Sequence, residues 1–173
     1  MKSYEIFRQM SPALAADIFT YLQSEQKPVL KTAIQGLANQ RNLRPVFIER
    51  KPPNERRAWL QAALSRKPSD ILATHLLQAW LLGAQKAMLC DFLDSLGIAH
   101  DADGTVEELP ESPPKEKLRV AINQLLAKYQ PEPAAVYLHA FYEMDGSVSW
   151  PPLGEVLQED ERLRLGFQVA LPA

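Results

Sequence analysis

The sequence predicts an all-α protein, an array or bundle of about eight short helices arranged as stacked helical hairpins. Prolines are spaced about one helix apart, apolar residues recur at helical spacing after them, and one stretch resembles another at a fixed offset. Proline fits the first turn of a helix but breaks its interior at a cost of about 3 kcal/mol. Each proline is therefore interpreted as a helix start.

The first half of the chain is expected to hold five such helices. Apolar residues at spacings of three and four predict them over residues 12–22, 28–37, 43–47, 54–64 and 68–83. Ser11 and Asn54 are the expected N-caps of two of them, and Gly83 the expected end of the last. The short helix 43–47 is expected to turn Leu43, Val46 and Phe47 inward.

A sixth helix, over residues 88–96, should stop at Gly97, because glycine readily adopts the positive φ that closes a helix. A tight-turn sequence follows, and a two-stranded β-ribbon over residues 98–106 is compatible with it. The run 107–116 is acidic and proline-containing, which is typical of an exposed linker.

These features predict two helical units packed as one domain. A basic N-terminal unit covers residues 1–98, an acidic linker covers 99–116, and an acidic C-terminal unit covers 117–173. The last unit is expected to contain helices over 118–126, 133–142 and 152–158. Its apolar end, 166–171, is expected to dock on the body or on another chain.

An internal similarity suggests a repeat. When residues 59–80 are laid on 121–142, several apolar positions coincide: Leu60 with Ile122, Leu64 with Leu126, Leu76 with Leu138, and Trp80 with Tyr142. Two amphipathic helices match in part by chance, so duplication and coincidence both remain open. A true duplication would mean stacked helical hairpins.

Composition and charge restrict the functional classes. The single cysteine excludes an intrachain disulfide and a thiolate-rich zinc site, and no apolar segment has the length of a signal peptide or a membrane span. We therefore expect a soluble cytoplasmic protein. Residues 1–90 carry about +7 and residues 91–173 about −9, a polarity that bears on partners more than on fold.

No catalytic signature is present, so an enzyme is less expected than a binding protein. Cys90 lies within a helix beside Asp91, a setting that disfavours the thiolate. Glycine-rich phosphate loops and nucleophile elbows are missing from the sequence. We expect no cofactor.

A metal site is not expected either. His75 lies on an apolar stripe and is interpreted as a core histidine, while His139 and Glu143 share a helix face that suits either a metal or an ion pair. The run from Asp101 to Gly104 resembles part of a calcium loop. Its register fails, because Ala99 and Pro110 would occupy ligand positions.

The remaining candidate is a basic segment over residues 41–67. Its cations are Arg41, Arg44, Arg50, Lys51, Arg56, Arg57, Arg66 and Lys67, opposed only by Glu49 and Glu55. Such a cluster can bind phosphates or an acidic protein surface. Solvated helix faces would explain the same residues without any ligand. The first six are the proposed contacts to an anionic partner.

Three functions remain open. The preferred one is a non-enzymatic helical scaffold or adaptor that binds a protein partner or associates with itself. The second is a nucleic-acid-associated regulatory protein that uses residues 41–67. The third is a small-molecule binder with an interhelical pocket lined by Trp59, His75, Trp80 and Tyr142.

Overall fold

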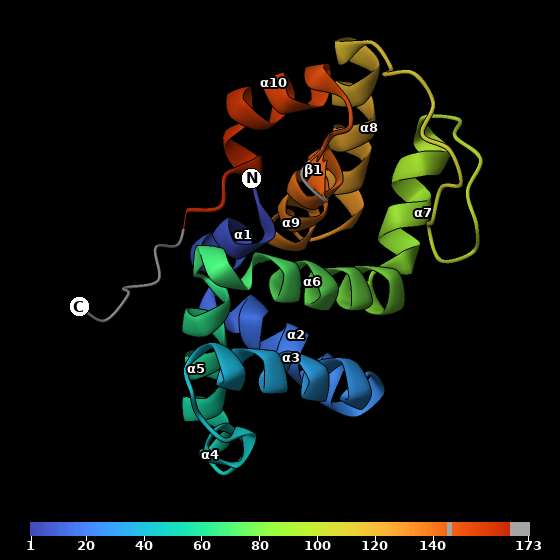
Figure 1. The fold of residues 1–173 in the computed structure, drawn as a ribbon. Coiled ribbons are helices and arrows are strands. Elements are labelled where there is room, and N and C mark those ends of the chain that lie inside the picture. Colours follow the sequence, from blue (N-terminus) through green and yellow to red (C-terminus); the bar gives the residue numbers. More distant parts are fainter. Residues whose placement is uncertain (145–146, 167–173) are drawn as a thin grey trace. The chain divides into compact units, whose positions relative to one another are not determined.

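The all-α prediction is confirmed. The computed structural model describes residues 1–144 and 147–166, and these ranges hold ten α-helices and one two-stranded ribbon (Figure 1). The chain divides into two compact units, Ser3–Trp80 and Leu81–Leu165, the second of which includes Met1–Lys2. The predicted linker, 99–116, falls inside the second unit, which we call unit 81–165.

Unit 3–80 consists of helices that follow one another through very short connections. They are α1 (Ser3–Gln9), α2 (Pro12–Glu25), α3 (Lys27–Gln40), α4 (Pro45–Glu49) and α5 (Pro53–Leu64), followed by a 3₁₀ turn (Lys67–Ser69) and the first part of α6 (Asp70–Ala84). α2 and α3 form a helical hairpin joined at Gln26, and α5 packs against both (Figure 1). Proline occupies the first or second position of α2, α3, α4 and α5, as predicted.

The structure confirms one predicted helix cap, Ser11, and corrects two other predicted helix ends. Ser11 caps α2, because its Oγ accepts a hydrogen bond from the Leu14 amide at 3.1 Å. The predicted cap Asn54 is wrong, since α5 already begins at Pro53 and Pro52 holds the cap position. A second proline therefore moves the start one residue earlier. Likewise α6 runs one residue past Gly83.

Helix α1 was not predicted, because its seven residues contain a single apolar turn and no proline. Tertiary contacts with α5 hold it in place. The buried Gln61 amide donates to the carbonyls of Phe7 and Met10, at 3.1 Å each. Burial of a side chain such as Phe7 or Met10 contributes about 1.5–3 kcal/mol.

Unit 81–165 surrounds α8 with neighbouring helices. After α6 come α7 (Lys86–Ser95), α8 (Lys115–Lys128), α9 (Pro131–Tyr142), strands β1 (Glu143–Met144) and β2 (Ser147–Val148), α10 (Pro151–Glu159) and a 3₁₀ turn (Glu161–Leu163). α8 packs against α7, α9 and α10 (Figure 1). The two helices α8 and α9 form a second hairpin.

Gly97 ends α7 as predicted. Its φ is 71°, and the amides of Gly97 and Ile98 donate to the carbonyls of Asp94 and Leu93, at 3.0 Å each. This is the Schellman pattern, in which a left-handed residue satisfies the last carbonyls of a helix.

The ribbon predicted over residues 98–106 is absent from the described chain. That segment forms a closed turn instead, in which the Asp101 amide donates to the Thr105 carbonyl at 2.8 Å. The ribbon lies at β1 and β2, with Glu143 paired to Val148 and Met144 to Ser147. In the sequence these strands flank Asp145-Gly146, a dipeptide typical of hairpins.

An aromatic cluster forms the centre of unit 81–165 and fixes its long loop. Phe92, Tyr137 and Phe141 meet edge to face with centroids 5.6–6.0 Å apart, and Phe141 lies 4.9 Å from Trp150. The Trp150 side chain is 1% exposed, and its Nε1 donates to the carbonyl of Pro110 at 3.0 Å. The acidic loop is thus tied to the core of its own unit.

The internal similarity stays a prediction. At the offset of 62 residues, α5 and α6 overlap α8 and α9, and the pairs Leu60/Ile122 and Leu76/Leu138 are all buried. Leu126 is half-buried whereas Leu64 is buried. The predicted docking end, 166–171, lies beyond the described residues except for an exposed Gly166.

Candidate functional site

The connection between α3 and α5 presents an apolar side chain among cations. α3 ends at Gln40, and Asn42 just after it has a left-handed φ of 53°, so that the Leu43 amide returns to the Ala38 carbonyl at 2.9 Å. The chain then enters α4, which spans only Pro45–Glu49. Ile48 is fully buried and anchors this short helix to its unit.

The prediction that Leu43 and Phe47 face the core is wrong. Phe47 is 61% exposed and Leu43 40% exposed, while Ile48 occupies the core position. A five-residue helix has room for one anchoring side chain, and the neighbouring apolar residues therefore face solvent. An exposed apolar patch can mark a binding surface, whereas a single exposed apolar side chain is ordinary.

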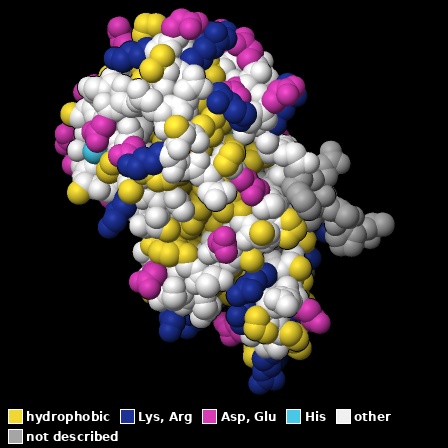
Figure 2. Space-filling view, turned by 180° about the vertical axis from the view of Figure 1, so that it is seen from behind, with side chains coloured by type: hydrophobic (Ala, Val, Ile, Leu, Met, Phe, Trp, Pro, Cys, Tyr) yellow, Lys and Arg dark blue, Asp and Glu magenta, His cyan; other side chains and the backbone are white. Residues whose placement is uncertain are grey.

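Cations flank these apolar residues. Arg44 precedes α4, Arg50 follows it, and Lys51 comes next in the chain. We call the five residues Leu43, Arg44, Phe47, Arg50 and Lys51 the α4 surface. Figure 2 shows Lys and Arg side chains beside hydrophobic ones at the lower end of the molecule, where α4 lies.

Two further predicted residues, Arg56 and Arg57, line a separate pocket between α2, α3 and α5. The Arg56 guanidinium donates to the Glu49 carbonyl at 3.2 Å, and that of Arg57 donates to Thr20 Oγ1 at 3.1 Å. The pocket has a volume of about 360 Å³ and also contains Lys27. We call it the α2–α5 pocket.

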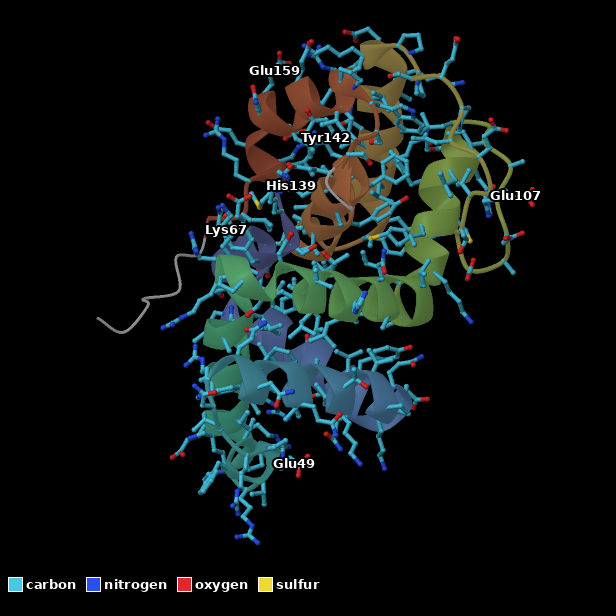
Figure 3. The ribbon with its side chains drawn as sticks, in the orientation of Figure 1. Glu49, Lys67, Glu107, His139, Tyr142 and Glu159 are labelled. Atoms are coloured by element: carbon cyan, nitrogen blue, oxygen red, sulfur yellow. The ribbon has the colours of Figure 1, made fainter. Side chains whose placement is uncertain are left out.

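The last predicted residue, Arg41, lies over the ring of Trp59, with its guanidinium carbon 5.2 Å from the ring centroid. Burial, together with the charge of Arg66, lowers the pKa of Arg41 below its ordinary value. Figure 3 labels Glu49 and Lys67 at well-separated points of unit 3–80. The predicted contacts therefore occur around α4, in the α2–α5 pocket and over Trp59, and the bond from Arg56 to the Glu49 carbonyl links the pocket to α4.

The cations of the basic segment form no ion pair with a carboxylate of residues 1–144 or 147–166. Within the described residues, none of its eight cations lies within 4.0 Å of a carboxylate oxygen. Glu49 and Glu55 are exposed and do not neutralise them. The charge of this segment is thus available to an external anion.

Cys90 has the properties of an inert thiol. It is half-buried in α7, and its Sγ lies 3.5 Å from the Ala102 carbonyl. Burial raises its pKa, and the nearby Asp94, Asp103 and Asp91 raise it further. A nucleophilic role would require the opposite shift.

The three histidines have three different environments. His75 is exposed, so its predicted place in the core is wrong. His139 is buried, donates from Nε2 to the Leu163 carbonyl at 2.9 Å, and has its pKa lowered by burial. His100 contacts the Asp101 carbonyl and Asp94 Oδ1 at 2.7 Å each, and the resulting hydrogen bonds raise its pKa.

In residues 1–144 and 147–166, no three His, Cys, Asp or Glu side chains come together in a group that could hold a metal ion. The residues expected to line an interhelical pocket belong to both units, with Trp59, His75 and Trp80 in unit 3–80 and Tyr142 in unit 81–165. Trp59 lies under Arg41, Trp80 is buried, and Tyr142 packs against Gly154 in unit 81–165.

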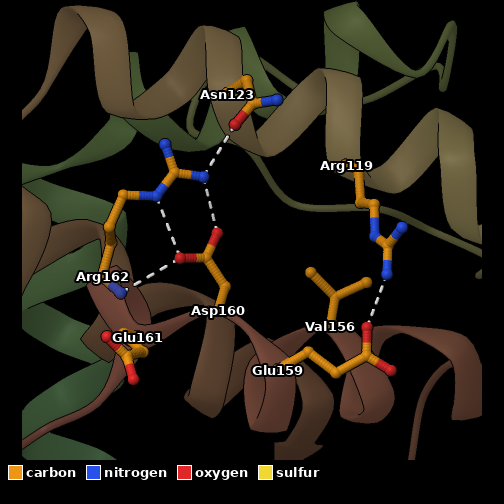
Figure 4. A pocket seen from close by; sticks show the side chains of 7 residues that line it. All are labelled: Arg119, Asn123, Val156, Glu159, Asp160, Glu161 and Arg162. Atoms are coloured by element: carbon orange, nitrogen blue, oxygen red, sulfur yellow. Dashed lines mark hydrogen bonds and ion pairs between the residues drawn. The ribbon is translucent and has the colours of Figure 1, made fainter.

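Sequence reasoning missed a polar pocket of about 350 Å³ in unit 81–165 (Figure 4). Its charged groups satisfy one another. Arg162 binds Asp160 through two hydrogen bonds of 2.6 and 2.9 Å and donates to Asn123 Oδ1 at 2.7 Å, while Arg119 contacts Glu159. An incoming ligand would have to break these pairs.

Comparisons with protein families, with curated protein sequences and with solved structures found no significant match. Among the described helices, none is long and apolar enough to cross a membrane. Functional inference therefore depends on the surfaces of the two units.

Proposed function

We propose that the protein is a non-enzymatic helical adaptor whose α4 surface binds an acidic protein partner. One observation carries the proposal: Phe47, 61% exposed, lies among three cations that form no ion pair with a described carboxylate. Aromatic residues and arginine are the residues most enriched at the centres of protein interfaces. The exposure of Phe47 costs free energy that a partner would recover by covering it.

Charge favours a partner with carboxylates around an apolar groove. Arg44 and Arg50 offer guanidinium groups that bind carboxylates with two parallel hydrogen bonds. These groups need not leave an internal ion pair before they bind. Phe47 and Leu43 would fill the apolar centre, and the cations would form its rim.

Nucleic acid fits the same surface less well. A duplex offers phosphates but no apolar groove for Leu43 and Phe47. The net charge of the whole chain is −2, which also opposes binding to a polyanion.

The test captures partners from the native cell with the native full chain and four variants of it. Phe47→Ala removes the aromatic centre, and Arg50→Glu reverses a rim charge. Ile71→Ala and Lys31→Glu are the matched controls, because Ile71 is 71% exposed and Lys31 is exposed in the same unit. A captured protein is then purified, and its affinity for each version is measured at low and high salt.

We expect Phe47→Ala to weaken binding by about thirtyfold, corresponding to ~2 kcal/mol. Arg50→Glu should weaken binding most at low salt, and the two controls should match the native chain. Equal binding by all five proteins would overturn the proposal. Binding of DNA or RNA that survives Phe47→Ala but not Arg50→Glu would favour the nucleic-acid function instead.

Self-association is tested with the same variants by light scattering. A second copy offers acidic residues of its own, since residues 91–173 carry about −9. Mass that rises with concentration at low salt, and fails to rise for Phe47→Ala and Arg50→Glu, would identify the partner as another copy of this chain. Constant mass at every concentration and ionic strength would exclude that partner.

A further inference from the structure

The α2–α5 pocket combines an apolar floor with a cationic rim. Three side chains of low exposure form its floor: Phe19, Leu30 and Leu60, at 3%, 4% and 1%. Polar and charged side chains complete the lining: Thr20, Gln23, Ser24, Lys27, Arg56 and Arg57. All of these residues belong to unit 3–80, so the pocket is complete within one unit.

The lining contains three cations and no carboxylate. Neither Arg56 nor Arg57 is neutralised by hydrogen bonding, because one donates to a backbone carbonyl and the other to a threonine hydroxyl. These bonds hold both guanidinium groups while leaving further N–H donors unused. A third cation, Lys27, is the first residue of the fourteen-residue helix α3.

Lys27 places the start of α3 at the same pocket. Gln26 holds its N-cap position and makes no side-chain hydrogen bond to the helix. The first amides of a helix carry partial positive charge, which favours an anion beside them. The side chain that normally satisfies such amides is missing here, and Lys27 already lies at the rim of the pocket.

We infer that this pocket binds a phosphate monoester carried on a small apolar body. A phosphate monoester has a charge of about −1.5 to −2 at pH 7, and its oxygens accept several hydrogen bonds at once. Three uncompensated cations match such a dianion better than a single carboxylate. The Thr20 hydroxyl adds a donor, because it accepts from Arg57 and keeps its own hydrogen, and the floor suits an apolar group attached to the phosphate.

The size of the pocket agrees with this ligand. Its volume of about 360 Å³ lies at the lower end of the ~300–1,000 Å³ range of small-molecule pockets. The inference does not depend on the α4 surface, since none of the five α4-surface residues lines the pocket. The phosphate could belong to a free metabolite or to a phosphorylated side chain of another protein.

Titration calorimetry on the full chain tests the inference with phenyl phosphate, inorganic phosphate and benzoate. Phenyl phosphate should bind most tightly, because inorganic phosphate lacks the apolar group and benzoate lacks the second charge. Arg57→Gln and Lys27→Gln should each weaken phenyl phosphate binding by about tenfold. Lys31→Gln is the control, as an exposed lysine of α3 outside the pocket.

Two comparisons make the outcomes decisive. Binding that is equal in all variants, or equally weak for the three anions, would overturn the inference. Urea unfolding of Arg57→Gln should match that of the native chain, so a loss of binding would not reflect misfolding. Phe47→Ala should bind phenyl phosphate normally, which separates this inference from the proposed function.

The source of the phosphate is distinguished by a further arm. A short peptide carrying phosphotyrosine is compared with phenyl phosphate, which is its isolated side-chain analogue. Tighter binding of the peptide by about tenfold or more would identify a phosphorylated protein as the source. Equal affinity would identify a small phosphate ester.

Discussion

The two units of this protein use their cations in opposite ways. In unit 81–165, five cations form ion pairs with nearby carboxylates: Lys115, Arg119, Lys128, Arg162 and Arg164. In residues 41–67 of unit 3–80, none of the eight cations pairs with a described carboxylate. The same residue types therefore organise one unit internally and leave the other able to bind an external anion.

Local acidity explains the difference. Carboxylates are abundant among residues 91–173 and scarce among residues 1–90. Exposed ion pairs contribute little to stability, so pairing mainly determines whether a charge is available to a ligand. Each prediction below tests one side of this comparison.

The largest expected effect is on the stability of unit 81–165, whose aromatic core includes Trp150. Trp150→Ala should lower the free energy of unfolding by about 3–5 kcal/mol, because it leaves a cavity beside Phe141 and releases the Pro110 carbonyl. Trp150→Phe should lose less, since the ring contact persists. Circular dichroism in urea measures both, and a loss below ~1 kcal/mol for Trp150→Ala would contradict the packing described here.

The next effect concerns the turn that leads into the α4 surface. Asn42→Ala should destabilise unit 3–80 by about 1–2 kcal/mol, because an alanine side chain disfavours the left-handed backbone at φ 53°. Asn42→Gly should be neutral or stabilising, since glycine adopts this conformation freely. Native-state hydrogen exchange on the amides of α3 and α4 measures the change. Equal protection in both variants would contradict a left-handed backbone at Asn42.

A smaller effect is expected at the polar pocket of unit 81–165. Asp160→Asn should cost about 0.5–1 kcal/mol, because it removes the negative charge that pairs with the Arg162 guanidinium at 2.6 Å, while the asparagine oxygen can still accept from the Arg162 amide.

Asp160 also predicts a pH dependence. In the folded state, hydrogen bonds from Arg162 lower the pKa of Asp160 below its ordinary value of 3.8. A depressed carboxylate pKa stabilises the fold above the ordinary pKa, and this contribution is lost as pH falls through the lower, folded-state value. The difference between the native chain and Asp160→Asn in urea should therefore be full at neutral pH and shrink below pH 3.8. A difference that grows in acid would exclude this account.

The smallest expected effect is that of salt on the paired cations of unit 81–165 and the unpaired cations of unit 3–80. Added salt should weaken the ion pairs of unit 81–165 and screen the repulsion between Arg41 and Arg66 in unit 3–80. Hydrogen-exchange protection should therefore fall in the first unit and rise in the second. A change of the same sign in both units would break the contrast between paired and unpaired cations.

The helices were predictable because proline restricts its own backbone in a way that survives any tertiary context. Pro12 begins a helix in the structure as predicted, and Pro45 and Pro53 begin helices within two residues of the predicted starts at 43 and 54. α1 escaped prediction, since side chains of the distant α5 hold it. Periodicity in seven residues does not reveal a helix of that kind.

The candidate site was predictable only in part. The sequence identified the cations of residues 41–67, because charge is visible in composition. It assigned Phe47 to the core, since apolar spacing alone does not tell which side chain of a short helix anchors it. The hydrogen bonds from Arg56 to Glu49 and from Arg57 to Thr20 depend on how α5 packs within its unit, which is a tertiary property.

Cys90 gives this molecule a built-in chemical reporter. The sequence has a single thiol, and carbonyls of the turn at residues 101–102 lie beside its Sγ. Because the raised pKa keeps that sulfur protonated, alkylating reagents should react slowly until the turn moves away. The labelling rate of one unmutated residue would thus record the opening of the acidic loop without any engineered probe.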